Sequence, residues 1–225
     1  MKRRLVRVLG LLLVLLCGAG VGLYLLSGRE PAWWYRPDAR TPLAAERLEN
    51  QVVSELSLAR PAERSGPYRS GEWTLEVTEE EANAWLATRL RAWVENRAGR
   101  WPGEVEGVRA AFRPGMVLLG ARLDESYGGR VVSGAAVPRI EPGGALWLRT
   151  EGMSLGGLPL PSGVLLDRLR SMVHAGGAEV VAALDGQAPL LPDAVVPMDD
   201  GRRVRITRIE VREGVLVLTC RTEKD

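Results

Sequence analysis

The pattern of apolar and polar positions divides the chain into an apolar N-terminal run and a longer mixed region. Residues 8–26 contain no charged side chain, and "MKRR" and Arg7 precede them. As a helix, this run of 19 residues would be about 28 Å long, close to the ~30 Å hydrocarbon thickness of a bilayer. We therefore predict an uncleaved transmembrane signal-anchor within residues 1–29. A cleavable signal peptide is the alternative, although its apolar region is usually shorter and ends in a small-x-small site.

The basic residues before the apolar run predict its orientation. Short positively charged flanks stay in the cytoplasm, so the rest of the chain is expected on the far side of the cell membrane, as a single-pass protein. Residues 30–40 then form a juxtamembrane segment whose Trp33, Trp34 and Tyr35 are expected at the membrane interface, where amphipathic rings gather. The alternative is that these rings belong to the core of the domain. Pro31 and Pro37, which bracket them, argue against it.

Residues 41–225 read as one domain that begins with helical periodicity. Thr41 and Pro42 are typical of a helix start, and an apolar stripe follows at helical spacing. A short strand is expected over residues 73–77. The next helix opens with a capping box, in which Thr78 and Glu81 each bond the other's backbone N–H. The apolar face predicted for this second helix consists of Ala82, Trp85, Leu86, Leu90 and Trp93.

Alternating positions then predict four strands joined by short turns. Residues 108–113 and 117–123 alternate around the turn "RPGM", and two further strands are expected over residues 131–140 and 145–155. A helix should follow near Leu165. A hairpin of residues 204–211 and 215–221 ends the chain, with a bulge or a strong twist where the apolar phase changes between Ile206 and Ile209.

These elements predict an α+β fold after the transmembrane helix. We expect one curved antiparallel sheet of about six or seven strands, packed against two or three amphipathic helices. The segment "GGLPLPSG" should turn the chain sharply from the fourth strand into the following helix, because proline fixes the backbone and glycine permits tight turns. Leu158 and Leu160 would then close one end of an apolar space between the helices and the sheet.

Three stretches resemble the YpmS-like family of small membrane-anchored bacterial domains. They are "WTLEVTEEEANAWLATRL", "LRTEGMSLGGLPLPSGVLLDRL" and "VVPMDDGRRVRITRIEVREGVLVL", within about residues 70–220. The resemblance implies a membrane-anchored bacterial domain. It transfers no catalytic residue, since the family has no established activity to carry over. The family is in turn similar to elongated lipid-binding folds, in which a curved sheet wraps a long helix.

Charge excludes nucleic acid as an expected partner. Outside residues 1–29 the chain carries a formal net charge of −3, from 25 basic and 28 acidic residues. A slightly acidic domain has no electrostatic attraction to a phosphate backbone.

The inventory of chemical groups predicts neither catalysis nor a metal or other cofactor. His174 is the single histidine, and Cys17 and Cys220 are too far apart in sequence to suggest a metal site. The "DDG" ending at Gly201 is interpreted as a turn. The glutamates at the start of the second helix are interpreted as capping groups. Asn83 is expected to bond the backbone, the alternative being a contact to a polar ligand head.

Two interpretations of the apolar elements remain open. In the first, the space between helices and sheet accepts a lipid or another apolar ligand beside the membrane. In the second, it is filled core, and the domain is a non-catalytic scaffold that binds other envelope proteins. An enzyme ranks third. The residues predicted for a ligand site are Trp85, Leu86, Trp93, Leu158, Leu160, Leu169 and Met172.

Overall fold

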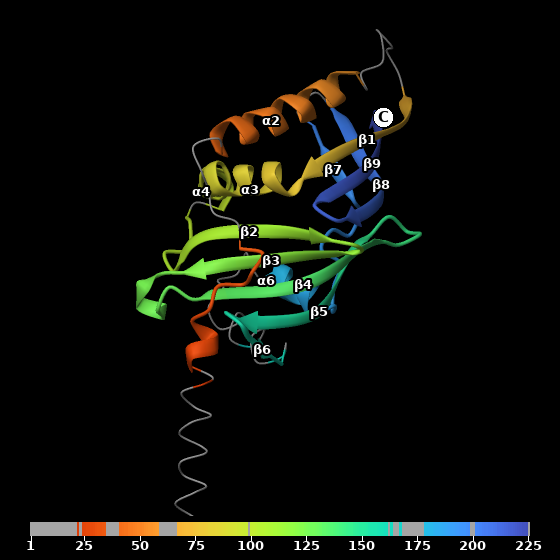
Figure 1. Ribbon diagram of the computed structural model, residues 1–225. Helices are drawn as coiled ribbons and strands as arrows, with labels where there is room; N and C mark the ends of the chain where they lie inside the picture. Colours follow the sequence, from red (N-terminus) through yellow and green to blue (C-terminus); the bar gives the residue numbers. More distant parts are fainter. Residues whose placement is uncertain are drawn as a thin grey trace, which may run out of the picture.

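The computed structural model describes residues 22, 24–34, 41–58, 67–98, 100–161, 163, 167, 178–198 and 201–224. Within these residues the chain is mostly β, with antiparallel strands arranged in two separate sheets (Figure 1). The sheets have four and five strands. Short helices pack against them, and the longest described helix lies at the top of Figure 1.

The five-stranded sheet is the predicted meander with one added strand. Its order follows the chain from β2 to β6, and all neighbours are antiparallel. Each strand follows directly on its neighbour because two-residue or short glycine-containing turns join them. The strands are β2 (Val105–Arg113), β3 (Met116–Leu123), β4 (Val131–Ile140), β5 (Leu146–Leu155) and β6 (Leu158–Leu160).

The four-stranded sheet joins the first strand of the domain to its last ones, in the order β1-β9-β8-β7. Its members are β1 (Tyr68–Thr78), β7 (Val195–Pro197), β8 (Arg202–Arg212) and β9 (Val215–Lys224). The predicted C-terminal hairpin is therefore confirmed. Its predicted bulge is also present, as a register shift between Ile206 and Arg208.

The helices are divided between the two sheets. α2 (Thr41–Leu58) and α3 (Glu79–Thr88) contact β1, and α4 (Leu90–Ala98) follows α3. α6 (Ala178–Leu184) contacts β5, and the 3-10 turn η1 (Glu125–Tyr127) lies between β3 and β4. The capping box is confirmed, because Thr78 and Glu81 bond each other's backbone N–H. The single helix predicted after Thr78 is two helices, which meet at Arg89.

The prediction of an α+β fold built on one curved sheet is wrong. β1 does not extend the meander but pairs along its length with β9. The two sheets meet instead at their hairpin turns, where the Gly214 N–H donates to the Phe112 carbonyl (3.0 Å) and the Gly115 N–H donates to the Val211 carbonyl (2.8 Å). Ala110, Phe112 and Val211 form a buried cluster at this junction. Alternation identifies a strand but not its partner, which is why the sequence did not separate the sheets.

The N-terminal prediction falls largely outside the described residues. Of the predicted span, only residues 22 and 24–26 are described. Within the described part of the chain, no helix has both the length and the apolar character needed to cross a bilayer. Of the helix expected near Leu165, the described residues 167 and 178–184 are helical, the latter as α6.

Candidate functional site

Helix α2 contacts α3 through small side chains. Ala44 and Ala45 of α2 and Ala84 of α3 are completely buried and form one cluster. Alanine lets two helices approach closely at this point. At the other end of α2, Arg202 donates from Nη1 to the Leu56 carbonyl (2.9 Å), which satisfies a backbone acceptor of the last turn. The helix is thus held at both ends.

An apolar cleft lies beside this contact, between α2, β1 and α3. Its volume is about 370 Å³, within the range of small-molecule sites. Glu49 is the charged member of the described lining, and it forms an ion pair with Arg89 (3.0 Å). The lining residues are Leu48, Glu49, Val52, Val53, Val77 and Trp85.

Exposed apolar side chains extend the cleft outward. Val53, on its α2 wall, is 62% exposed. Trp85 contacts Trp93 of α4 edge to face, with ring centroids 6.4 Å apart, and Trp93 is 48% exposed. Aromatic pairs of this geometry add roughly 0.5–1.5 kcal/mol to area burial. The result is an open apolar surface with an aromatic wall.

The structure separates the residues predicted for one ligand site. Trp85 lines the cleft and Trp93 contacts Trp85, whereas Leu86 packs against the buried Ala110, Phe112 and Val211. Leu158 and Leu160 lie on β6, at the opposite edge of the five-stranded sheet from β2. Leu169 and Met172 lie outside the described residues.

The expected sharp corner is instead the β5–β6 hairpin. Leu158 pairs with Leu155, and Leu160 pairs with Met153. Gly156 has φ +58°, the positive value that a two-residue hairpin loop requires at its first position. The glycine pair therefore turns one strand onto the next, and it does not close a space beneath the helices.

Sequence analysis did not identify the α2 side of the cleft, because the apolar stripe of this helix has the same pattern as a helix face that packs into a hydrophobic core. Leu48 and Val52 belong to the helical stripe of α2, which sequence periodicity assigns to packing. Val53 lies outside that stripe, and Val77 belongs to a strand whose partner was unknown. Only the packing of α2 on β1 and α3 brings these side chains together.

Asn83 binds the backbone of the edge strand β2, as predicted. Its amide donates to the Ala110 carbonyl (2.7 Å) and accepts from the Ala110 N–H (2.9 Å), and the side chain is completely buried. Two residues further along β2, the Phe112 N–H donates to the Glu79 carboxylate (2.9 Å). Side chains of α3 thus occupy hydrogen-bonding positions that a further strand would fill.

The other glutamates of this helix start also have structural partners. Glu81 completes the capping box, which confirms that interpretation. Glu80 forms an exposed ion pair with Arg47 of α2 (3.4 Å). Glu79 pairs with Arg113 (3.1 Å) in addition to its backbone contact.

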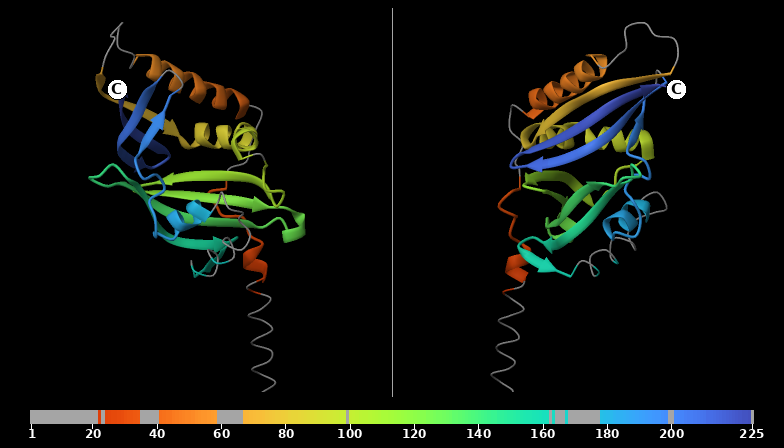
Figure 2. Two further views of the ribbon diagram at one scale, coloured as in Figure 1. Left: turned by 180° about the vertical axis from the view of Figure 1, so that it is seen from behind. Right: turned by 90° about the vertical axis from the view of Figure 1, so that its right-hand side faces the viewer.

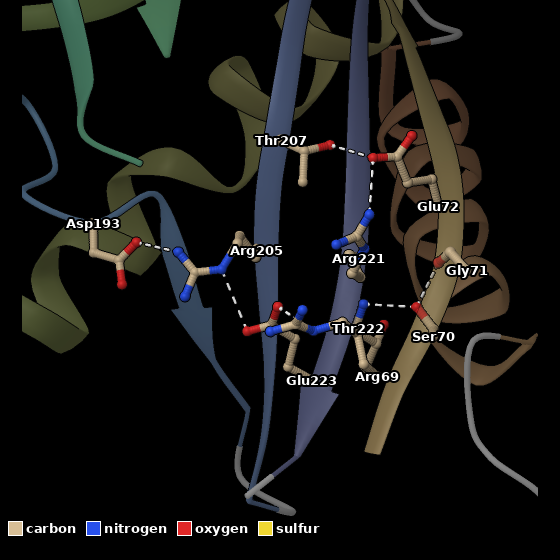
Figure 3. Close-up of polar contacts among 10 residues, drawn as sticks. All are labelled: Arg69, Ser70, Gly71, Glu72, Asp193, Arg205, Thr207, Arg221, Thr222 and Glu223. Atoms are coloured by element: carbon tan, nitrogen blue, oxygen red, sulfur yellow. Dashed lines mark hydrogen bonds and ion pairs between the residues drawn. The ribbon is translucent and has the colours of Figure 1, made fainter. Parts of the chain in front are cut away.

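A polar network covers part of the four-stranded sheet (Figure 3). Arg205 bridges Asp193 (2.6 Å) and Glu223 (3.3 Å), and Arg69 also pairs with Glu223 (3.3 Å). The hydrogen bond to Asp193 raises the pKa of Arg205. Next to this group, Arg221 pairs with Glu72 (3.2 Å). Opposite charges alternate across the strands, so the network holds neighbouring strands together and offers no excess of one charge to an ionic ligand.

The tryptophans predicted at the membrane interface lie on the five-stranded sheet. Trp33 and Trp34 contact each other, with ring centroids 5.9 Å apart, and both approach Gly120 of β3. Tyr35 lies outside the described residues. Trp33 and Trp34 thus pack on the domain and are half-buried there, outside its buried core. Their place at a membrane interface stays a prediction.

Cys220 is expected to resist thiol reagents in the folded protein. The side chain is 3% exposed, and burial raises the pKa of its thiol to about 11. The thiol is therefore protonated at neutral pH, and only the thiolate reacts. The pKa of a cysteine thiol in an unfolded chain is about 8.5. The raised pKa of Cys220 therefore stabilises the folded protein fully below about pH 8.5, and this stabilisation is lost as the pH rises toward 11. Alkylation followed by peptide mapping should modify Cys220 only after denaturant is added. Rapid labelling of the native chain would contradict this prediction.

The remaining candidate groups give no second site among the described residues. In that part of the chain, no three or more His, Cys, Asp or Glu residues are placed to hold a metal ion. His174 and Cys17 lie outside it. The resemblance to the YpmS-like family stays an expectation from the three stretches that suggested it. Comparison of the chain with protein-family models, curated proteins and solved structures gave no match.

Proposed function

We propose that this protein is a non-catalytic, single-pass envelope protein that binds an apolar ligand, such as a lipid acyl chain, outside the cytoplasmic membrane. The observation that carries the proposal is the cleft between α2, β1 and α3, with its valine, leucine and tryptophan lining. The apolar N-terminal run supports the membrane anchor.

The shape and chemistry of the cleft favour an apolar occupant. Concave sites of this size usually bind ligands through apolar and aromatic walls and a few polar groups. Glu49 and Arg89 supply one polar pair beside the cleft, where a ligand's head group could bond. No covalent step is required of these residues.

A protein partner is the second candidate, favoured by the exposed Val53 and Trp93 next to the cleft. Tryptophan is enriched among residues that dominate binding energies at protein interfaces. In this case the same cleft would accept apolar side chains of another envelope protein.

Filling the cleft tests the proposal. Val53→Trp should place an indole in the cleft and weaken binding of a long-chain fatty acid at least about tenfold, equivalent to roughly 1.4 kcal/mol. The measurement is a fatty-acid titration of the full chain in detergent, followed by native mass spectrometry.

Leu43→Trp is the matched control. Leu43 is also on α2 and is 61% exposed, close to the 62% of Val53, but it does not line the cleft. It should bind fatty acid as the wild type does. Equal weakening by both substitutions, or absence of binding in the wild type, would overturn acyl-chain binding. A protein captured by the wild type and lost with Val53→Trp would favour the second candidate.

A further inference from the structure

A segment that precedes the domain lies across the five-stranded sheet. We call residues 24–34 the N-terminal strap. Figure 1 shows the strap, in orange-red, rising from the bottom of the molecule and crossing in front of β3 and β4. The contacts that hold it come from three separate parts of the sheet.

The first contact is at the β5–β6 turn. The Gly157 N–H donates to the Leu26 carbonyl (2.9 Å). A β-carbon at Gly156 would lie 2.7 Å from the carbonyl carbon of Ser27 and 2.8 Å from the carbonyl oxygen of Arg29. Ser27 is 4% exposed although it precedes the domain. The strap backbone therefore packs directly on the glycine pair.

The second contact is at the centre of β3. A β-carbon at Gly120 would lie 2.8 Å from Cη2 of Trp33 and 3.0 Å from Cζ3 of Trp34. The guanidinium of Arg122 lies over the Trp34 ring, 5.3 Å from its centroid. This distance fits a cation–π contact. Only a glycine leaves room for both indoles at this position.

Charged side chains make the third set of contacts. Glu30 forms an ion pair with Arg122, and these side chains are 33% and 27% exposed. At the start of the strap, the guanidinium of Arg130 lies 4.9 Å from the centroid of the Tyr24 ring. Contacts thus occur from Tyr24 to Trp34. A flexible linker would show no such series.

We infer that the N-terminal strap is a rigid mount that fixes which way the domain faces on the membrane. Figures 1 and 2 place the start of the strap and α2 at opposite ends of the molecule in every view. A folded unit of about 190 residues is about 40 Å across. The cleft beside α2 is therefore held on the side away from the bilayer, and its ligand arrives from the aqueous side. The mount rests on the proposed anchor and not on ligand binding in the cleft.

Energy transfer to the bilayer tests the mount in the full chain. Fluorophores are placed at Val53→Cys, beside the cleft, or at Tyr127→Cys, three residues before Arg130. Both variants also carry Cys17→Ser, so that the dye reacts with the introduced cysteine alone. The buried Cys220 can stay, because it is expected not to react. With an acceptor dye on lipid head groups, position 127 should transfer energy several-fold more efficiently than position 53.

Removing the strap contacts should abolish that difference. Trp33→Ser with Trp34→Ser removes the contact at β3, and Gly156→Ala displaces the strap backbone at the β5–β6 turn. The triple variant frees the strap at both places and leaves the domain core intact, so both positions should give intermediate transfer. The second variant combines Gly156→Ala with Gly120→Leu, which displaces both indoles. Arg149→Gln removes an exposed ion pair elsewhere and should change nothing. Circular dichroism checks that each variant is folded.

The outcomes separate the mount from the proposed function. Retention of the full difference in both strap variants would overturn the mount. Equal transfer from both positions in the wild type would do so as well. If neither position transfers energy to the bilayer, the membrane anchor is overturned. Loss of fatty-acid binding alone leaves the mount standing.

Discussion

Replacing Asn83 with alanine is expected to lower the free energy of unfolding by about 3 kcal/mol. The substitution removes both hydrogen bonds to Ala110 and leaves a buried N–H and a buried carbonyl without partners. Each unsatisfied buried group costs roughly 1–3 kcal/mol. Asn83 also donates to the Glu79 carbonyl (2.8 Å), so the helix start loses a contact as well. Urea denaturation of the detergent-solubilised chain measures the change.

Thr88→Ala provides the comparison within the same helix. Thr88 donates to the Ala84 carbonyl four residues earlier (2.8 Å), a local bond that leaves no distant group unpaired when it is lost. Thr88 is half-buried and its bond is local, so we expect the free energy of unfolding to fall by about 1 kcal/mol or less, the net value of one hydrogen bond. Similar losses for both variants would show that Asn83 does not join α3 to β2.

Gly156→Ala is expected to release the lower end of the N-terminal strap. The residue has φ +58°, a conformation that costs non-glycine residues about 1–2 kcal/mol. Its new methyl group would also meet the backbone of Ser27 and Arg29. We expect the free energy of unfolding to fall by about 3 kcal/mol in total, because displacing that packed backbone costs at least as much as the strain. Hydrogen exchange at the Gly157 N–H, which bonds Leu26, should accelerate.

Gly115→Ala isolates the backbone part of that effect. Gly115 has φ +77° in the β2–β3 turn, and no atom lies within 4 Å of the position its β-carbon would take. The Gly115→Ala variant should lose only about 1–2 kcal/mol of its free energy of unfolding. If the two alanine variants unfold at the same urea concentration and Gly157 stays protected, the strap does not rest on Gly156.

Local features of the fold were predictable from sequence because their signals lie within a few residues. The capping box depends on Thr78 and Glu81 alone, and the strands of the meander are joined by short turns. The bulge after Ile206 appears as a change in alternation. The pairing of β1 with β9 carries no such signal, because its two strands come from opposite ends of the domain.

The candidate site was harder to predict than the strands. Trp85 was identified from an apolar helix face, yet Leu86, from the same face, packs into the core between the sheets. Proline and glycine in "GGLPLPSG" fit either a corner or a tight hairpin, and the hairpin formed because Leu158 could pair with Leu155. The cleft depends on how α2 packs, which no local pattern determines.

The side chains of α3 on β2 have a consequence for neighbouring copies of the protein. Open strand edges invite pairing between chains, and short strands, prolines, bulges and charges discourage it. Here β6 and β7 have three residues each and contain Pro159 and Pro197, while β1 has a register shift next to Arg69. β2 is nine residues long, and Asn83 and Glu79 occupy bonding positions along its edge. Losing Asn83 would therefore expose an edge of β2 on which a strand of a second copy of the protein can pair, and aggregation through intermolecular β-pairing would follow.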